Sequence, residues 1–156
     1  FLRSNNIRFR EGLIGEDIDW TLQLVSVMKS ADVYEDGIYY YRISENTRRS
    51  YGNEKSLDDQ LKIIEKWLNK SMHSKSKKHI LAFLAFQYAI VLPFYGALPS
   101  ETRKKYKDRI KALRFLLKEG KTNKIRLVRT AVCLLGPGNT SRLLYKYVIR
   151  RDGTDE

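Results

Sequence analysis

The spacing of apolar side chains divides the chain into a mixed N-terminal stretch and a helical remainder. After Asn53, apolar residues recur every three or four positions, a period typical of amphipathic helices. Ser56 followed by Asp59 resembles a capping box, which predicts a helix running to about Met72. Four more helices are expected: one starting at Ser74 or Ser76, one from Ser100 to Gly120, one from Asn123 to Gly136, and one from Asn139 or Thr140 to about Arg151.

The N-terminal stretch carries strand and helix signals together. Ile7 to Phe9 alternates apolar and polar residues, which predicts a short strand. Gly15-Glu16-Asp17 opens a helix that runs to about Lys29, and acids in the first turn suit the helix macrodipole. The runs Ala31 to Tyr34 and Ile38 to Ile43 flank the turn Glu35-Asp36-Gly37, which predicts a β-hairpin.

These patterns together predict a mainly α fold. We expect short strands or a β-hairpin plus one helix at the N-terminal end, followed by a helical bundle. The expected division is 1–52 for the mixed unit, 53–151 for the helical extension and 152–156 for a tail.

One uncharged segment has the length of a membrane span. Ile80 to Leu98 contains no Asp, Glu, Lys or Arg, and basic residues flank it on both sides. It also contains Pro93 and Gly96, which a cleaner membrane span would lack. We therefore favour a core helix, buried all round and more buried than the other helices over Ile80 to Val91.

An ordered motif occupies Phe9 to Ser50. It reads F-x-E-G-x-x-x-E-D-x-D-W, then an apolar helix, then I-Y-Y-Y-R, then a polar loop ending in R-R-S. This order resembles the C-terminal end of the catalytic domain in family-2 glycosyltransferases of the GT-A fold, which build bacterial surface and exopolysaccharides. The resemblance covers about a third of the chain, residues 1 to 50, and the helical extension is similar to the variable C-terminal extensions of such enzymes.

The resemblance implies a function and a set of site residues. The chain is expected to be the C-terminal part of an inverting nucleotide-sugar glycosyltransferase of the hexosyltransferase type. By position, Asp17 matches the catalytic base, Glu16 its partner in the motif, Trp20 the aromatic packed behind the pair, Arg42 the arginine that closes the aromatic strand, and Arg48, Arg49 and Ser50 the segment that folds over the donor diphosphate.

Elementary chemistry is compatible with this assignment. Inverting transfer needs a base that takes the proton of an acceptor hydroxyl, and backbone N–H groups orient and stabilise a carboxylate at a helix N-terminus. The structural alternatives stay open: Asp17 as a first-turn acid that stabilises its helix, Trp20 as core, and Arg42 as an ion-pair partner of an acid such as Asp36.

Asp17-Ile18-Asp19 has the D-x-D spelling of the family's metal site, but we do not interpret it as one. Two residues along a helix lie about 200° apart around its axis, so these carboxylates are expected on different faces. We therefore expect no metal site here and no cofactor in this chain. The resemblance places the nucleotide sugar, with Mg²⁺ or Mn²⁺, in a donor-binding half that the chain lacks, so the isolated chain is expected to be inactive.

The net charge of +12 is concentrated near the C-terminus. Residues 99–151 hold sixteen Lys and Arg against three Asp and Glu, which favours an anionic partner. On the helix beginning near Ser100, five basic residues form a stripe away from the apolar one: Lys104, Lys107, Lys111, Arg114 and Lys118. We expect this stripe to face either solvent or the anionic inner leaflet of the membrane, where a lipid-linked saccharide acceptor would lie.

Two alternatives to the enzyme remain. The basic segment, with aromatics such as Tyr106 and Tyr147, fits a nucleic-acid-binding module, although most of these aromatics fall on apolar faces, so we expect no nucleic-acid partner. An assembly module is the other alternative. The lone Cys133 excludes an internal disulfide and favours a reducing compartment, with burial as its expected environment. A cytoplasmic location, peripheral at the inner membrane, follows from these expectations.

Overall fold

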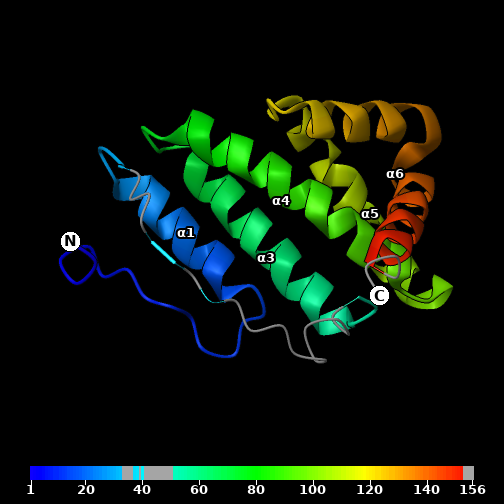
Figure 1. Cartoon of the computed structure of the whole chain (residues 1–156), viewed down its shortest axis with the longest axis horizontal. Coiled ribbons are helices and arrows are strands. Elements are labelled where there is room, and N and C mark those ends of the chain that lie inside the picture. Colours follow the sequence, from blue (N-terminus) through cyan, green and yellow to red (C-terminus); the bar gives the residue numbers. More distant parts are fainter. Residues whose placement is uncertain (33–36, 39, 41–50, 153–156) are drawn as a thin grey trace.

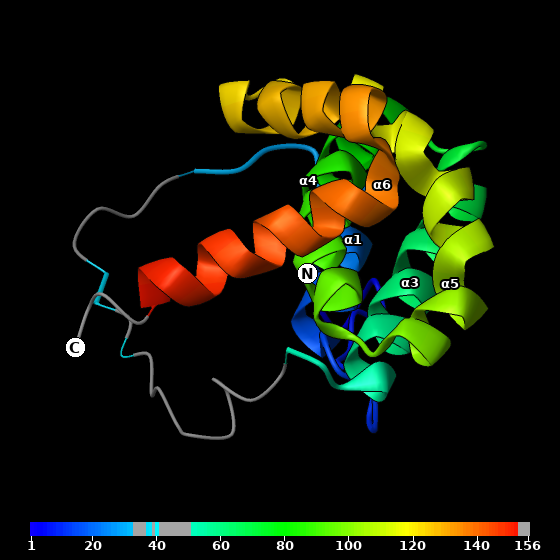
Figure 2. The ribbon, with the colours of Figure 1, turned by 90° about the vertical axis from the view of Figure 1, so that its right-hand side faces the viewer.

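The computed structural model describes residues 1–32, 37, 38, 40 and 51–152, and it is helical wherever it has regular structure (Figure 1). The elements are α1 (Glu16–Val27), α3 (Glu54–Ser71), α4 (Lys77–Ala97), α5 (Ser100–Leu113), the 3₁₀ helix η1 (Arg114–Lys118) and α6 (Asn123–Asp152). Helices α1, α3 and α4 lie side by side, and α5 and α6 pack around the far end of α4 (Figures 1 and 2).

The predicted strands are wrong, because the described residues contain no strand. The backbone of Arg8 is hydrogen-bonded to a side chain instead of to a neighbouring strand: its N–H donates to Gln23 Oε1 at 3.3 Å, and its carbonyl accepts from Gln23 Nε2 at 3.0 Å. One amide group on α1 thus satisfies the polar groups that would otherwise need a strand. Of the predicted hairpin, Ala31, Asp32, Gly37, Ile38 and Tyr40 are described and form no strand, while 33–36, 39 and 41–43 lie outside the described residues.

Helix α4 lies at the centre of the fold, as expected for a core helix. It contacts every other described helix, and Leu84, Tyr88 and Val91 have no exposed surface. It is the one helix of the described chain long and apolar enough to cross a membrane, but 56% of that apolar stretch is buried in the protein. The expectation of burial all round is wrong at Phe86, which is 49% exposed.

The start of α3 is one turn earlier than predicted. Asn53 caps the helix, since its side-chain oxygen accepts from the N–H groups of Lys55 at 2.9 Å and Ser56 at 3.3 Å. The predicted capping box is therefore wrong. Ser56 lies inside the helix, and Asp59 accepts a hydrogen bond from the backbone N–H of Ile14 instead.

Helix α6 is two helical arms joined at a bend. Gly136 has φ 75° and ψ 161°, so the arms meet where the Gly-Pro-Gly sequence predicts an interruption. The second arm crosses α4 so closely that a Cβ atom on Gly96 would lie 2.1 Å from the carbonyl oxygen of Ser141. Figure 2 shows the two arms diverging from the bend. Cys133, on the first arm, is exposed, contrary to the burial expected for it.

Candidate functional site

The two acids of the Glu16-Asp17 pair lie at the exposed N-terminus of α1. Both side chains are exposed, and the preceding Gly15 has φ 85°, a left-handed conformation that suits glycine. The left-handed turn carries the chain from the loop directly into the first turn of the helix. Asp17 is therefore accessible to a substrate at a helix end whose dipole stabilises an anion.

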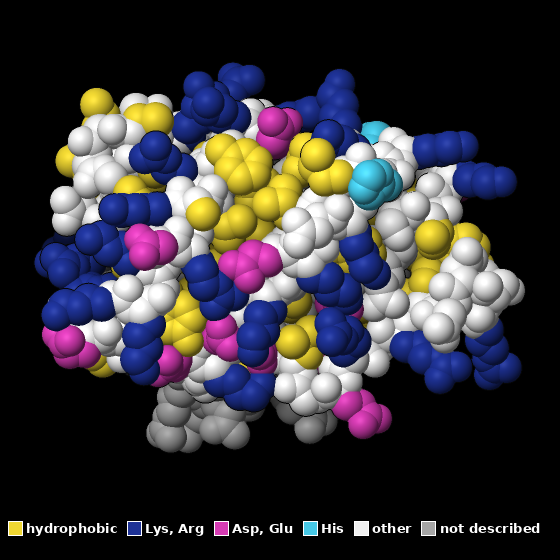
Figure 3. Space-filling view, turned by 180° about the vertical axis from the view of Figure 1, so that it is seen from behind, with side chains coloured by type: hydrophobic (Ala, Val, Ile, Leu, Met, Phe, Trp, Pro, Cys, Tyr) yellow, Lys and Arg dark blue, Asp and Glu magenta, His cyan; other side chains and the backbone are white. Residues whose placement is uncertain are grey.

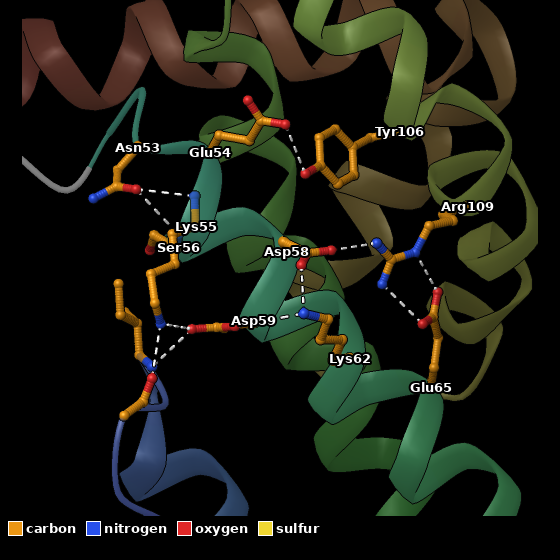
Figure 4. A network of polar contacts seen from close by, with 12 residues as sticks. Asn53, Glu54, Lys55, Ser56, Asp58, Asp59, Lys62, Glu65, Tyr106 and Arg109 are labelled. Carbon is orange, nitrogen blue, oxygen red and sulfur yellow. Dashed lines mark hydrogen bonds and ion pairs between the residues drawn. The ribbon is translucent and has the colours of Figure 1, made fainter.

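Helix α3 holds the loop that precedes these acids. The backbone N–H of Ile14 donates to Asp59 Oδ2 at 3.1 Å, and Lys55 Nζ donates to the carbonyl oxygen of Gly12 at 2.8 Å. Lys55 and Asp59 also form an ion pair with each other (Figure 4). The helical extension thus fixes the position of the motif, through contacts 43 and 45 residues apart in the sequence.

Asp19 is buried on the opposite side of α1. Its Oδ1 accepts from Lys66 Nζ at 2.6 Å and from Trp67 Nε1 at 2.7 Å, and its Oδ2 accepts from Gln23 Nε2 at 3.2 Å. Burial raises the pKa of Asp19, but the bonds from Lys66 and Trp67 and the charge of Lys66 outweigh burial and lower the pKa below its ordinary value. Asp17 is exposed and Asp19 has no exposed surface, so these two carboxylates do not converge on one metal ion.

A basic cleft of about 420 Å³ lies beside this buried carboxylate. Its lining includes four basic residues: Arg8, Arg10, Lys66 and Lys70. Sequence reasoning missed all four, and no spacing could have identified them, because they come from the N-terminal segment and from α3. The ammonium groups of Lys66 and Lys70 lie 5.4 and 5.0 Å from the ring centroid of Trp67.

The remaining motif residues divide into one that the structure places and several that it does not describe. Trp20 stacks on Phe9, with ring centroids 5.4 Å apart and planes 4° from parallel. This contact joins the two ends of the acidic part of the motif, which begins at Phe9 and ends at Trp20. Arg42, Arg48, Arg49 and Ser50, together with Asp36, lie outside the described residues.

A second polar network joins α5 to α3. Arg109 binds Glu65 with both arms of its guanidinium, Nε–Oε1 at 2.7 Å and Nη2–Oε2 at 2.8 Å, and its Nη1 donates to Asp58 Oδ1 at 2.7 Å (Figure 4). The hydrogen bonds that Arg109 donates to Glu65 and Asp58, together with the charges of these acids, outweigh burial and raise the pKa of Arg109. Tyr106 donates to Glu54 Oε1 at 3.1 Å. This arrangement is architectural: it fixes the extension that in turn fixes the motif loop.

The predicted basic stripe of α5 and η1 is exposed. Lys104, Lys107, Lys111, Arg114 and Lys118 are all exposed, while the apolar side of the same segment is buried at Tyr106, Ile110 and Leu117. Acids interrupt this surface: Lys104 lies 2.9 Å from Glu101, and Lys105 lies 3.5 Å from Glu54. The face seen in Figure 3 likewise shows Asp and Glu among many Lys and Arg side chains.

The described residues contain no group of three or more His, Cys, Asp or Glu side chains that could hold a metal ion. Comparison of the chain with family models, with curated proteins and with solved structures found no match.

Proposed function

We propose that this chain forms the acceptor side of an inverting nucleotide-sugar glycosyltransferase of bacterial polysaccharide synthesis, with Asp17 as the catalytic base. The observation that supports it best is the contrast within one helix: Asp17 is exposed at the N-terminus of α1, and Asp19 is fully buried in an ion pair. The fold uses one carboxylate to anchor the helix and leaves the other accessible, which is the arrangement that a general base requires.

The proposed step is a single displacement. The oxygen of an acceptor hydroxyl attacks the anomeric carbon of the donor sugar and forms the new C–O bond. The bond from that carbon to the nucleoside diphosphate oxygen breaks and takes its electron pair with it. The hydroxyl proton goes to a carboxylate oxygen of Asp17. The resemblance assigns the donor diphosphate and its Mg²⁺ or Mn²⁺ to a donor-binding half of the enzyme, outside the residues of this chain.

The loop that precedes Asp17 supports the proposal, because helix α3 holds it in place and a catalytic base must be held in place. Asp59 and Lys55 bind the backbone of Ile14 and Gly12, only a few residues before Asp17. A carboxylate that is misplaced by about 1 Å can lose about a hundredfold in rate. The helical extension therefore supports catalysis by holding the loop that precedes the base.

The test uses the enzyme that includes the donor-binding half. Asp17→Asn keeps the shape of the side chain and removes the proton acceptor, so turnover should fall by roughly 10²–10⁴-fold while donor affinity and thermal stability stay unchanged. Glu119→Gln, a change at an exposed acid outside the motif, is the matched control and should keep its activity. Turnover of Asp17→Asn within tenfold of the parent would contradict the assignment.

A further inference from the structure

Both arms of α6 expose apolar side chains. Leu127 and Leu134 on the first arm are 71% and 78% exposed, and Leu143 and Tyr147 on the second arm are 53% and 64% exposed. Leu135 and Ile149 are also exposed. Where such side chains form a contiguous exposed patch, the patch usually marks a surface that binds a partner.

Part of this surface is a groove between the two arms and α4. The groove has a volume of about 520 Å³ and a mainly apolar lining that includes Phe86, Ile90, Leu127, Val128 and Tyr147. Leu127 comes from the first arm and Tyr147 from the second, so the bend at Gly136 brings the two arms to one apolar site. Lys124 and Arg151 lie in the lining as well.

The charge of α6 is almost entirely of one sign. The helix has seven exposed basic residues: Lys124, Arg126, Arg129, Arg142, Lys146, Arg150 and Arg151. Its acidic content is Asp152 alone, at the C-terminal end. In this it differs from α5, where Glu101 and Asp108 lie among the lysines. An apolar surface with basic residues around it is the pattern of a helix that lies in the interface of an anionic bilayer.

We propose that α6 docks on an anionic lipid surface, with the exposed apolar side chains of both arms inserted among the lipids and the basic side chains on the headgroups. A second copy of the chain fits less well, because two such faces would bring seven positive charges against seven. Nucleic acid also fits less well, because Leu127, Leu134 and Leu143 are aliphatic and cannot stack on bases. This docking surface is independent of the proposed glycosyl transfer.

The experiment is vesicle binding by the chain, measured by co-sedimentation. Vesicles of phosphatidylglycerol and phosphatidylcholine should bind the chain, more weakly as salt rises, and vesicles of phosphatidylcholine alone should not. The apolar variant Leu127→Asn/Tyr147→Asn and the charge variant Lys124→Glu/Lys146→Glu should each lower partitioning by about tenfold or more. All four positions are exposed, so these variants should fold, as circular dichroism would verify.

Two matched variants fix the location of the surface. Phe1→Asn/Met72→Asn removes exposed apolar groups elsewhere, and Lys107→Glu/Lys111→Glu makes the same charge change on α5. Both should bind as the parent does. In Tyr147→Trp, tryptophan emission should shift to the blue when anionic vesicles are added, by more than in the parent, whose tryptophans are Trp20 and Trp67.

Several outcomes would overturn the proposal. One is an absence of anionic-vesicle binding at low salt, and another is equal loss in the α5 variant, which would indicate a diffuse charge effect. Dimers that dissociate in Leu127→Asn/Tyr147→Asn would assign the groove to a second copy. Binding of duplex DNA or RNA would favour a nucleic-acid partner under two conditions. The duplex would have to displace the chain from vesicles, and its affinity would have to fall for the charge variant but not for the apolar variant.

Discussion

The indole N–H of Trp67 donates a hydrogen bond to the Asp19 carboxylate over 2.7 Å, and both side chains are buried. Forty-eight residues separate the two in sequence. The bond joins the helix of the candidate motif to the helical extension, and Lys66 adds its charge to the same oxygen. The extension and the motif therefore share one buried polar contact, and the motif helix depends on the extension for its stability.

Replacing Asp19 by Ala should lower the free energy of unfolding by about 3 kcal/mol, because it leaves Lys66 and the buried Trp67 N–H without an acceptor. Asp17→Ala removes an exposed acid from the same helix and should cost less than about 1 kcal/mol. Urea unfolding at pH 7 measures both. Equal costs at the two positions would mean that the ion pair does not anchor α1.

The stability of the protein should fall in acid. The carboxyls of Asp19, Asp58 and Asp59 are raised in pKa by burial, but hydrogen bonds and nearby lysines outweigh this and lower each pKa below the ordinary 3.8. A pKa lowered by folding contributes stability that is present above pH 3.8 and is lost as pH falls through the folded value.

The measurement that checks this sign is a series of urea titrations between pH 6 and pH 2.5. The parent should lose stability from about pH 4 downward. The difference in the free energy of unfolding between the parent and Asp19→Asn should narrow over the same range. A gap that is constant with pH would show that Asp19 is not linked to protons in this way.

Gly96→Ala should destabilise the protein by about 3 kcal/mol or more, because the new Cβ would overlap backbone atoms that cannot move independently. The clash is with Ser141, whose carbonyl carbon would lie 2.5 Å away. Gly138→Ala is the matched control, since nothing lies within 4 Å of a Cβ there. Thermal denaturation of the two variants compares them directly, and equal melting temperatures would contradict the close approach of α4 and α6.

Arg109→Ala should lower the free energy of unfolding by about 1–2 kcal/mol. A partly exposed ion pair is weaker than a buried one, but this guanidinium binds two acids at once. Arg109→Lys keeps the charge and loses the two-armed geometry, so it should recover less than half of that cost. Lys104→Ala, which removes an exposed pair with Glu101, should change stability by less than about 0.5 kcal/mol. If all three variants unfold at the same urea concentration as the parent, the Arg109 network contributes nothing to stability.

The helices after Asn53 were predictable because their signals are local. Apolar spacing, Gly120 and the Gly136 interruption each act within a turn or two, and the structure confirms helices in the predicted segments. The predicted first strand failed because a distant partner decided the outcome. The segment after Ile7 is not a strand because the Gln23 amide satisfies the backbone of Arg8. The capping box failed for a local reason, since Asn53 caps the helix in place of Ser56 and leaves Asp59 inside it, where it binds the N–H of Ile14.

The candidate site was predictable only in part, for the same reason. Helical geometry alone separates Asp17 from Asp19, and the structure has one exposed and the other buried. The partner of Asp19 could not be predicted, because the Lys66-Trp67 pair has the ordinary appearance of an amphipathic helix. Cys133 lies in an apolar run that suggested burial, yet no element covers that side of the described α6.

The two glycines that shape α6 restrict mutation for opposite reasons. Gly96 has no room for a methyl group, whereas Gly136 has open space around its missing Cβ and needs glycine for its backbone angle alone. A straight helix of 30 residues would extend about 45 Å, and its second half could not return to α4. Folding should therefore tolerate mutation least at the joint and at Ser141, and more at the exposed leucines, whose replacement is expected to weaken lipid binding without changing the angle between the arms.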